Sequence, residues 1–354
     1  MSPKSIKTYW GTNGSPCNAP FNNMYFTVDG KVSPCWKLPG FVDDWSEERS
    51  IMDIWKGEHF QKYRDALMQL EFPTRCKECE VEIENDVWPL AKAYQQFGVN
   101  NNGYPALMEL ELSNQCNLEC IMCSGKLSSG IRKKEGKPPL PRIYNDAFIS
   151  QLEEFIPHLK ELRFNGGEPF AQKIVLDICD MVARINPDLP INVATNGTVF
   201  NKRVKHILAN NNISINISID SLIPERYEEI RINGDFNLLM KNVEIFKQYC
   251  HSNKRGLSIM VNPMRNNFEE MGHFAEWTSQ IGAALWFNTI LYPKDLSIKH
   301  LPSNELEEVY NTLHNQLKAM DNKTIRNYKV FEHLVNNQIR NWLLDSHLIL
   351  VSEG

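Results

Sequence analysis

The sequence lacks any long hydrophobic run. No stretch of its 354 residues approaches the roughly 18 consecutive apolar residues of a membrane-spanning helix. The first ten residues, Met1 to Trp10, carry lysines and polar side chains where a secretory signal peptide has an apolar segment. These two absences predict a cytoplasmic protein that does not act at a membrane.

A strong charge of either sign is also missing. The 38 Lys and Arg residues and 43 Asp and Glu residues give a formal net charge of -5. This balance gives no broad electrostatic reason to expect nucleic acid as a partner. Hydrophobic residues at 42% and charged residues at 23% are typical of a globular chain, and the length allows a large domain with a smaller one.

Nine cysteines in a chain without an export signal are not expected to form a disulfide framework. Their spacing instead indicates metal ligation, because seven of them fall into two groups. Cys179 belongs to neither group and lies in an apolar helical pattern, where we expect a small buried side chain.

From about residue 105 onward, short apolar runs alternate with amphipathic helical patterns. This alternation predicts parallel strands joined by right-handed crossovers, and six such units predict a partial (β/α)6 TIM-like barrel of the α/β class. The expected strands lie near 107–113, 160–165, 191–195, 213–219, 257–263 and 284–291. The expected helices lie near 145–157, 171–186, 200–210, 236–250 and 268–281.

The first hundred residues follow a different pattern. Asp29-Gly30 between two apolar runs predicts a β-hairpin with a type I′ turn. Ser50 and Asp53 predict the start of a short helix that ends near Gly57, and a second helix follows over about 58–69. We therefore expect a small hairpin-plus-helix domain over 1–95, a barrel over 105–300 and a helical C-terminal extension over 301–354.

A three-cysteine motif directly follows the first barrel strand. Cys116, Cys120 and Cys123 have the spacing Cys-x3-Cys-x2-Cys, in a loop at the carboxyl end of a strand, where α/β barrels build their active sites. Three thiolates can hold three irons of a [4Fe-4S] cluster and leave the fourth iron open. The alternative, a zinc site, normally needs a fourth ligand and favours paired Cys-x2-Cys knuckles.

The spacing of this motif, its position and Met122 before the last cysteine resemble the radical S-adenosylmethionine (SAM) superfamily. The resemblance implies that the amino and carboxylate groups of SAM chelate the open iron. It also implies that reductive cleavage of SAM yields a 5′-deoxyadenosyl radical, which abstracts a hydrogen atom from the substrate.

Residues at the ends of the later strands also resemble motifs of the same family. Gly166, Gly167 and Glu168 resemble its Gly-Gly-Glu signature, which contacts the amino group of SAM. Asn196 ends the third strand in a way that is familiar in the family. Ser218, Asp220 and Arg231 follow the pattern of family residues that lie near the ribose and carboxylate of SAM.

The other four cysteines lie in the N-terminal region. The pattern Cys17-x12-Gly30-x4-Cys35, a gap of 40 residues and Cys76-x2-Cys79 resembles the Twitch/SPASM domain. That resemblance implies an auxiliary [4Fe-4S] cluster, although four cysteines with one Cys-x2-Cys knuckle also fit structural zinc. In most relatives this domain follows the barrel, whereas here it precedes the barrel.

Together, the resemblances imply a radical SAM oxidoreductase. The auxiliary cluster would accept an electron from the substrate radical, so that the substrate undergoes net oxidation. Flavodoxin or ferredoxin would supply electrons from outside, and the substrate would be an unknown small molecule or peptide. The alternatives are a peptide maturase that forms cross-links or epimerises residues, and a zinc-stabilised binding scaffold without catalysis.

Overall fold

The computed structural model describes residues 15–38, 42–84, 93–98 and 102–352. Its internal contacts divide the chain into two compact units. The first unit comprises Met1–Gln115, Gly136–Val193 and Lys202–Ile213, and the second comprises Cys116–Glu135, Ala194–Asn201 and Ser214–Gly354.

The first unit contains a sheet in which strands of the N-terminal segment pair with strands that follow residue 105. In spatial order its strands are β3 (Asp43–Asp44), β2 (Lys31–Ser33), β1 (Asn23–Phe26), β4 (Leu107–Leu110), β5 (Glu161–Phe164) and β6 (Pro190–Thr195). The pairs from β1 to β6 are parallel, and β2 pairs antiparallel with β1 and β3. The N-terminal strand β1 therefore extends the parallel sheet beside β4.

The predicted hairpin is present, but its turn is not of type I′. That turn requires positive φ at both central residues, and among the described residues Gly30 has a φ of 78° whereas Asp29 is not in the positive region. The Thr27 carbonyl accepts from the Gly30 amide, and the Thr27 amide donates to the Lys31 carbonyl, each at 3.0 Å. A hydrogen bond from Thr27 Oγ1 to Asp29 Oδ1 holds this longer loop.

The helices of the first unit include those expected beside the cysteines and between the barrel strands. They are α2 (Ala19–Asn22), α3 (Ile51–Lys56), α4 (Glu58–Met68), η1 (Thr74–Cys76), α5 (Lys77–Glu84), α7 (Asp146–Glu153), η3 (Pro169–Ala171), α8 (Lys173–Ile185) and α9 (Lys202–Asn210). Ser50 and Asp53 form the expected capping box at the start of α3. Cys179 on α8 is fully buried, as predicted.

Aromatic packing joins the N-terminal segment to α7 within the first unit. The Phe26 and Phe148 rings lie 5.4 Å apart, and the Trp45 and Tyr144 rings stack at 5.5 Å. Such pairs contribute about 0.5–1.5 kcal/mol each beyond the burial of their area. The Tyr144 hydroxyl also donates to the Thr27 carbonyl at 2.7 Å, so side chains from both parts of the sequence share one core.

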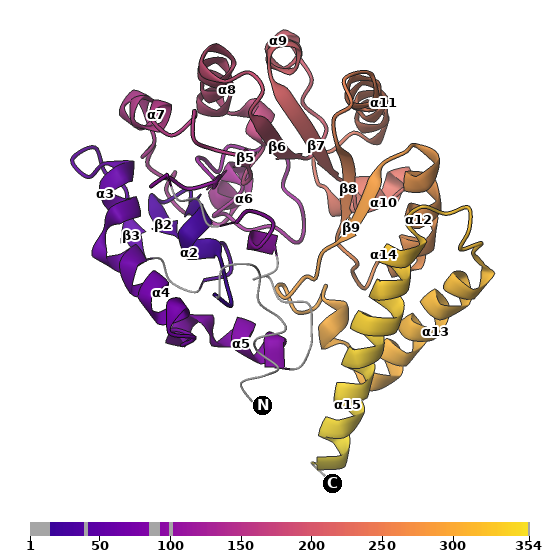
Figure 1. Cartoon of the computed structure of the whole chain (residues 1–354). Coiled ribbons are helices and arrows are strands. Elements are labelled where there is room, and N and C mark those ends of the chain that lie inside the picture. The colour runs from indigo at the N-terminus through magenta and orange to yellow at the C-terminus, as the bar shows by residue number, and fades with distance from the viewer. Residues whose placement is uncertain (1–14, 39–41, 85–92, 99–101, 353–354) are drawn as a thin grey trace. The chain divides into compact units, whose positions relative to one another are not determined.

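The second unit contains the parallel strands β7 (Asn212–Ser218), β8 (Leu257–Val261) and β9 (Ala284–Phe287). Of its helices, the first precedes these strands in the sequence, and the later ones follow β7 and continue into the C-terminal region (Figure 1). They are α6 (Ser129–Lys134), α10 (Pro224–Ile230), α11 (Phe236–Ser252), η4 (Phe268–Glu270), α12 (Met271–Gln280), η5 (Ile298–His300), α13 (Ser303–Ala319), α14 (Tyr328–His333), the π-helix η6 (Leu334–Ile339) and α15 (Arg340–Ser352).

The predicted α/β fold class with a partial barrel and a helical C-terminal region is confirmed. Each expected barrel strand corresponds to one of β4 to β9, while α10 was not predicted. The domain boundaries at 95, 105 and 300 stay a prediction. Within the described residues, no helix combines the length and the apolarity that crossing a membrane requires.

Candidate functional site

The three-cysteine loop belongs to the second unit, and backbone hydrogen bonds hold it there. The Glu119 amide donates to the Ile232 carbonyl, and the Ile121 amide donates to the Ile230 carbonyl, each at 3.0 Å. The Ser128 hydroxyl donates to the Leu118 carbonyl at 2.9 Å. The loop is thus fixed to the end of α10 and to the start of α6, which positions its thiols.

The three thiols are half-buried and unpaired by disulfides. Burial raises the pKa of Cys120 to about 11, with further contributions from Asp220, Cys123 and Cys116 that Arg231 opposes. Burial also raises the pKa of Cys123. Ionising Cys120 and Cys123 therefore requires a positively charged partner, and iron is a suitable partner for thiolate ligands.

A buried arginine lies beside this loop. Arg231 and Asp220 are 5% and 0% exposed, and Arg231 Nη2 lies 2.7 Å from Asp220 Oδ2. Arg231 Nη1 lies 3.9 Å from Cys120 Sγ. Burial alone would lower the pKa of Arg231, but Asp220 and then Cys120 raise it above its usual value. Arg231 Nε has no hydrogen-bond partner among the described residues, so one buried donor remains for a ligand.

Asp220 is held in turn by residues that follow β8. Its Oδ1 accepts from the Asn262 backbone amide at 2.8 Å and from the Asn262 side chain at 2.9 Å. The Asn267 side chain donates to the Asp220 carbonyl at 2.7 Å. Both carboxylate oxygens of Asp220 are therefore engaged within the protein, which makes it a support for Arg231.

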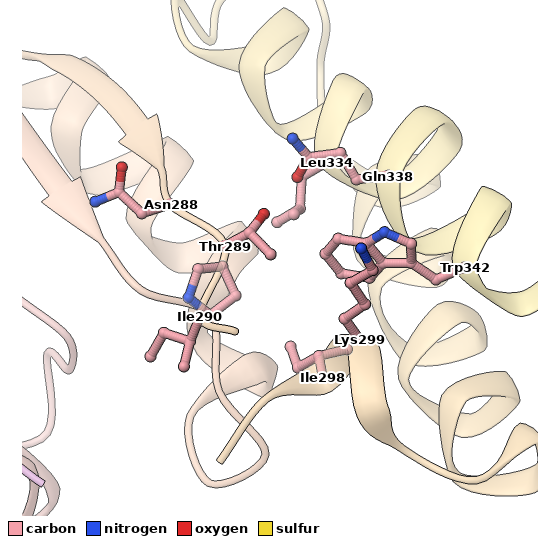
Figure 2. A pocket seen from close by; sticks show the side chains of 9 residues that line it. Asn288, Thr289, Ile290, Ile298, Lys299, Leu334, Gln338 and Trp342 are labelled. Atoms are coloured by element: carbon pink, nitrogen blue, oxygen red, sulfur yellow. The ribbon is translucent and has the colours of Figure 1, made fainter. Parts of the chain in front are cut away.

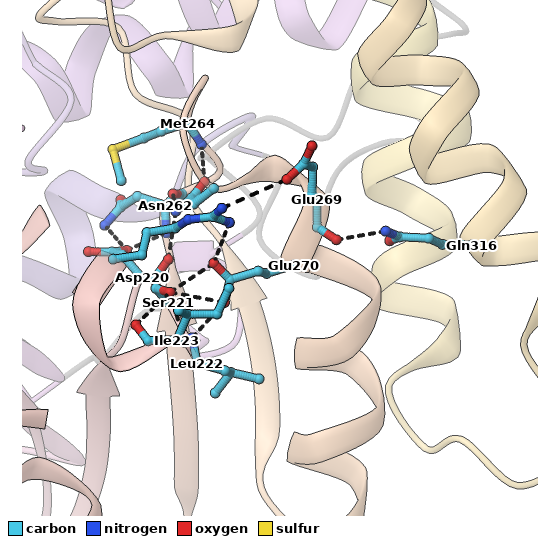
Figure 3. A network of polar contacts seen from close by, with 11 residues as sticks. Asp220, Ser221, Leu222, Ile223, Asn262, Met264, Glu269, Glu270 and Gln316 are labelled. Atoms are coloured by element: carbon cyan, nitrogen blue, oxygen red, sulfur yellow. Dashed lines mark hydrogen bonds and ion pairs between the residues drawn. The ribbon is translucent and has the colours of Figure 1, made fainter. Parts of the chain in front are cut away.

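A second buried carboxylate holds the segment after Asp220 (Figure 3). Glu270, 4% exposed, accepts from the Ser221 hydroxyl at 2.8 Å, from the Leu222 amide at 2.7 Å and from Arg226 Nη1 at 2.9 Å. The neighbouring Glu269 carbonyl accepts from Gln316 on α13 at 2.6 Å (Figure 3). This network fixes the turn that carries Asp220.

Asn196 also supports the cysteine loop. Its side-chain nitrogen donates to Asn117 Oδ1 at 2.9 Å and lies 3.9 Å from Cys116 Sγ. Its side-chain oxygen accepts from the Thr198 amide at 2.9 Å, and Asn117 donates to Thr198 Oγ1 at 2.8 Å. Asn117, between the first two cysteines, therefore links the motif to the end of β6.

The remaining two predicted residues of the second unit differ in their surroundings. Met122 packs against the buried Ile230, Met264 and Ile290. Ser218 is half-buried at the carboxyl end of β7, and its hydroxyl makes no hydrogen bond with another described residue.

The Gly-Gly-Glu turn lies in the first unit. Gly166 and Gly167 have φ values of 72° and 39°, which favour glycine. A Cβ on Gly167 would lie 2.5 Å from the Gln115 carbonyl oxygen and 2.8 Å from that of Ser113. The Glu168 amide donates to Gln115 at 2.8 Å, and Glu168 Oε1 caps η3 by accepting from Phe170 at 3.0 Å. The turn thus packs tightly against the residues that precede Cys116.

The four N-terminal cysteines all belong to the first unit. All four are half-buried and free of disulfides. Burial, followed by Cys35, raises the pKa of Cys17 well above its usual value. Burial raises the pKa of Cys35 and Cys76 to about 12 each, with the other thiols adding to the shift. Among the described residues, no three His, Cys, Asp or Glu side chains converge closely enough to ligate a single metal ion.

Tyr94 and Glu109 lie beside these cysteines and were not predicted. Cys17 and Cys35 pack against a buried cluster of Ala19, Tyr94 and Leu107. Glu109, 3% exposed, accepts from the Tyr94 hydroxyl at 2.7 Å and from the Asn23 side chain at 2.8 Å. Cys17 and Cys35 are therefore packed against a cluster that includes Leu107 of β4.

Two sequence profiles match the chain. The profile of the radical SAM superfamily matches residues 110–278, which include the three-cysteine motif. A profile described as an iron-sulfur cluster-binding domain, SPASM, matches residues 17–80, which include the other four cysteines. The two matches follow the same order along the chain as the two predicted cysteine sites.

Similar curated proteins include GTP 3′,8-cyclases. That of Limosilactobacillus fermentum is 27% identical over 175 residues, 48% of this chain and 50% of the cyclase. That of Haemophilus influenzae strain PittEE is 22% identical over 228 residues, 64% of this chain and 62% of the cyclase. The chain thus spans about half to three fifths of the length of these relatives.

Similar solved structures include SuiB of Streptococcus suis bound to the precursor peptide SuiA. It has 12% sequence identity and a TM-score of 0.44, and the match covers 74% of this chain and 51% of SuiB. A structure described as native anSMEcpe with bound AdoMet has 18% identity and a TM-score of 0.44, with 60% and 61% of the chains covered.

Proposed function

Because the chain belongs to the radical SAM superfamily and carries a SPASM iron-sulfur cluster-binding domain, we propose that Cys116, Cys120 and Cys123 hold the catalytic [4Fe-4S] cluster. The family implies binding of SAM as well as of iron-sulfur clusters. When bound, the catalytic cluster and SAM would supply a 5′-deoxyadenosyl radical that takes a hydrogen atom from the substrate. The auxiliary cluster would accept the second electron of a net oxidation.

The observation that carries this proposal is the position of Arg231. Its buried guanidinium lies 3.9 Å from Cys120 Sγ and retains a free Nε donor. An arginine fork suits a carboxylate, because it donates parallel hydrogen bonds. We assign Arg231 to the carboxylate of SAM, and we assign Asp220 and Asn196 to holding Arg231 and the cysteine loop in place.

The other contacts with SAM follow from the strand ends and the cysteine loop. The Gly166-Gly167-Glu168 turn would receive the amino group of SAM through backbone that comes close to the loop residues before Cys116. Ser218, with a hydroxyl free of described partners, would contact the ribose. Met122, packed against Ile290, would form the apolar wall of the cofactor site.

The auxiliary site would consist of Cys17, Cys35, Cys76 and Cys79. Four thiolates saturate a [4Fe-4S] cluster, so this site would bind no substrate and would serve electron transfer. The substrate would lose a hydrogen atom to the 5′-deoxyadenosyl radical, then an electron to the auxiliary cluster and finally a proton. Flavodoxin or ferredoxin would supply the electron that each cleavage of SAM consumes. GTP is the first substrate to test, since the similar cyclases are named for it.

Metal content and cleavage of SAM test the two sites. Anaerobically reconstituted protein should contain roughly eight irons per chain, whereas four irons and one zinc would assign the auxiliary site to zinc. Cys120→Ala should abolish the formation of 5′-deoxyadenosine. Cys179→Ala, which alters a buried cysteine outside both groups, is the control and should retain it. Undiminished formation by the Cys120 variant would disprove the assignment of the cluster.

The redox balance of the product tests the role of the auxiliary cluster. A product with two electrons fewer than the substrate is expected. A redox-neutral product from protein with an intact auxiliary cluster would contradict electron transfer to that cluster.

A further inference from the structure

A shallow open pocket lies within the second unit, where two neighbouring parallel strands end. It encloses about 220 Å³, including its open mouth. Pro263 follows β8, and Asn288 and Thr289 directly follow β9, so the pocket lies at the carboxyl ends of these strands. In open α/β sheets this is the end at which ligands bind.

The C-terminal helices form the opposite wall. Thr289 and Ile290 face Leu334 and Trp342 across the pocket (Figure 2). Leu334 and Gln338 both belong to the π-helix η6. π-helical turns are rare and occur frequently at functional sites. A widened helical turn therefore faces the pocket.

Several polar groups of this pocket have no partner within the part of the chain that the structure describes. The half-buried side chains of Gln338 and Trp342 make no hydrogen bond there, and Lys299 makes no ion pair. In contrast, the indole N–H groups of Trp45 and Trp55 donate to Gln151 and to the Gly103 carbonyl, at 3.0 and 2.8 Å. The Trp342 ring and its donor remain available to a ligand.

The pocket and the cysteine loop of the same unit share one apolar cluster. Ile290 lines the pocket and belongs to a buried cluster with Ile230 and Met264. Ile121 and Met122, from the cysteine motif, pack against this cluster. A ligand in the pocket would therefore contact Ile290, which belongs to the same apolar cluster that Ile121 and Met122 pack against.

We propose that this pocket is a substrate subsite for a flat ring that carries an anionic group, an inference that rests on the proposed function. The ring would lie against the face of Trp342, over the apolar floor of Ile290 and Leu334. Lys299, the only charged residue that lines the pocket, would pair with the anionic group. The pocket is too small to enclose a whole small-molecule ligand, so it would receive only one edge of the substrate at its open mouth.

Matched probes test this subsite in anaerobically reconstituted holoenzyme. GMP and indole-3-acetate carry a ring and a negative charge, and guanosine and indole are their uncharged counterparts. We expect the charged probes to bind more tightly. Trp342→Leu should weaken the binding of the charged probes by roughly tenfold, because stacking on an aromatic side chain is lost. Lys299→Gln should remove the difference between each charged probe and its uncharged counterpart.

The control is Trp286→Leu, which alters an exposed tryptophan of β9 that does not line the pocket and should leave the affinities unchanged. If neither charged probe binds the wild type, or if both Trp342→Leu and Lys299→Gln bind like the wild type, the subsite is refuted. Formation of 5′-deoxyadenosine without substrate is measured in the same preparations. If the wild type forms no 5′-deoxyadenosine but still binds the charged probes, the proposed function is contradicted and the subsite is supported.

Discussion

Asp220→Asn is the most informative single change, because it removes a buried charge while keeping the shape of the side chain. Asp220 is fully buried, and its Oδ2 lies 2.7 Å from Arg231 Nη2. The asparagine oxygen can still accept both hydrogen bonds from Asn262. Its amide nitrogen would then face Arg231, so that two donors meet where an ion pair stood.

The expected effect follows from the burial of both partners. Removing one partner of a buried ion pair typically costs about 3–5 kcal/mol, because the other charge remains buried without compensation. Arg231 can reduce this cost by turning away, which would break its contact with Cys120 at 3.9 Å. If about 2 kcal/mol of the loss appears in the binding of the SAM carboxylate, the Kd for SAM rises roughly 30-fold.

Equilibrium binding of SAM to anaerobically reconstituted protein measures this effect, with iron content determined on the same samples. The matched control is Asp44→Asn, because Asp44 pairs with Lys31 at the surface and its side chain is 64% exposed. Exposed pairs contribute about 0–1 kcal/mol, so this variant should bind SAM like the wild type.

Unchanged affinity of Asp220→Asn for SAM, at full iron content, would refute the reasoning. It would mean that Arg231 keeps its position without Asp220, or that Arg231 does not contact SAM. Loss of iron from the variant would instead show that the ion pair supports the cysteine loop more than the cofactor.

Three other changes are expected to have measurable results. Gly167→Ala would place a Cβ 2.5 Å from the Gln115 carbonyl oxygen at a positive φ, so titration should show SAM affinity reduced by at least roughly tenfold. Burial raises the pKa of the Cys35 thiol above its ordinary value to about 12, so the thiols of the unfolded chain ionise at lower pH than those of the folded chain. The free energy of unfolding of iron-free protein, measured with urea, should therefore fall as pH rises above about 9, and an unchanged value between pH 8 and 10 would contradict this. Glu270→Gln removes the charge that holds Arg226 at 2.9 Å, and it should raise the KM for SAM several-fold at constant iron content. An unchanged KM would mean that the Glu270 network does not support the cofactor site.

The barrel strands could be predicted because their signal is local. In β7, every second residue from Ile213 to Ile217 is buried, which reproduces the alternation in the sequence. Helix α3 was equally accessible, because Ser50 and Asp53 form their capping box within four residues. The turn type at Asp29-Gly30 was not predictable from the dipeptide alone, since the Thr27 side chain changes the loop.

The cysteine motifs were predictable for the same reason, whereas their supports were not. The spacing of Cys116, Cys120 and Cys123 stands within eight residues of sequence. Glu270 reaches Ser221 and Leu222, in the turn after Asp220, from 49 and 48 positions away, through contacts that only the folded chain creates. The roles of such residues depend on tertiary contacts, which have no periodic or spacing signal.

The pairing of β1 with β4 gives a physical reason for the position of the cluster-binding region before the barrel. Asn23 on β1 and Tyr94 both donate to the buried carboxylate of Glu109 on β4. Without the N-terminal region, Glu109 would lose these two donors and keep Arg163, and β4 would become an exposed edge that invites pairing with other chains. The region with the four cysteines therefore stabilises the sheet of the first unit, and its removal would expose the edge of β4.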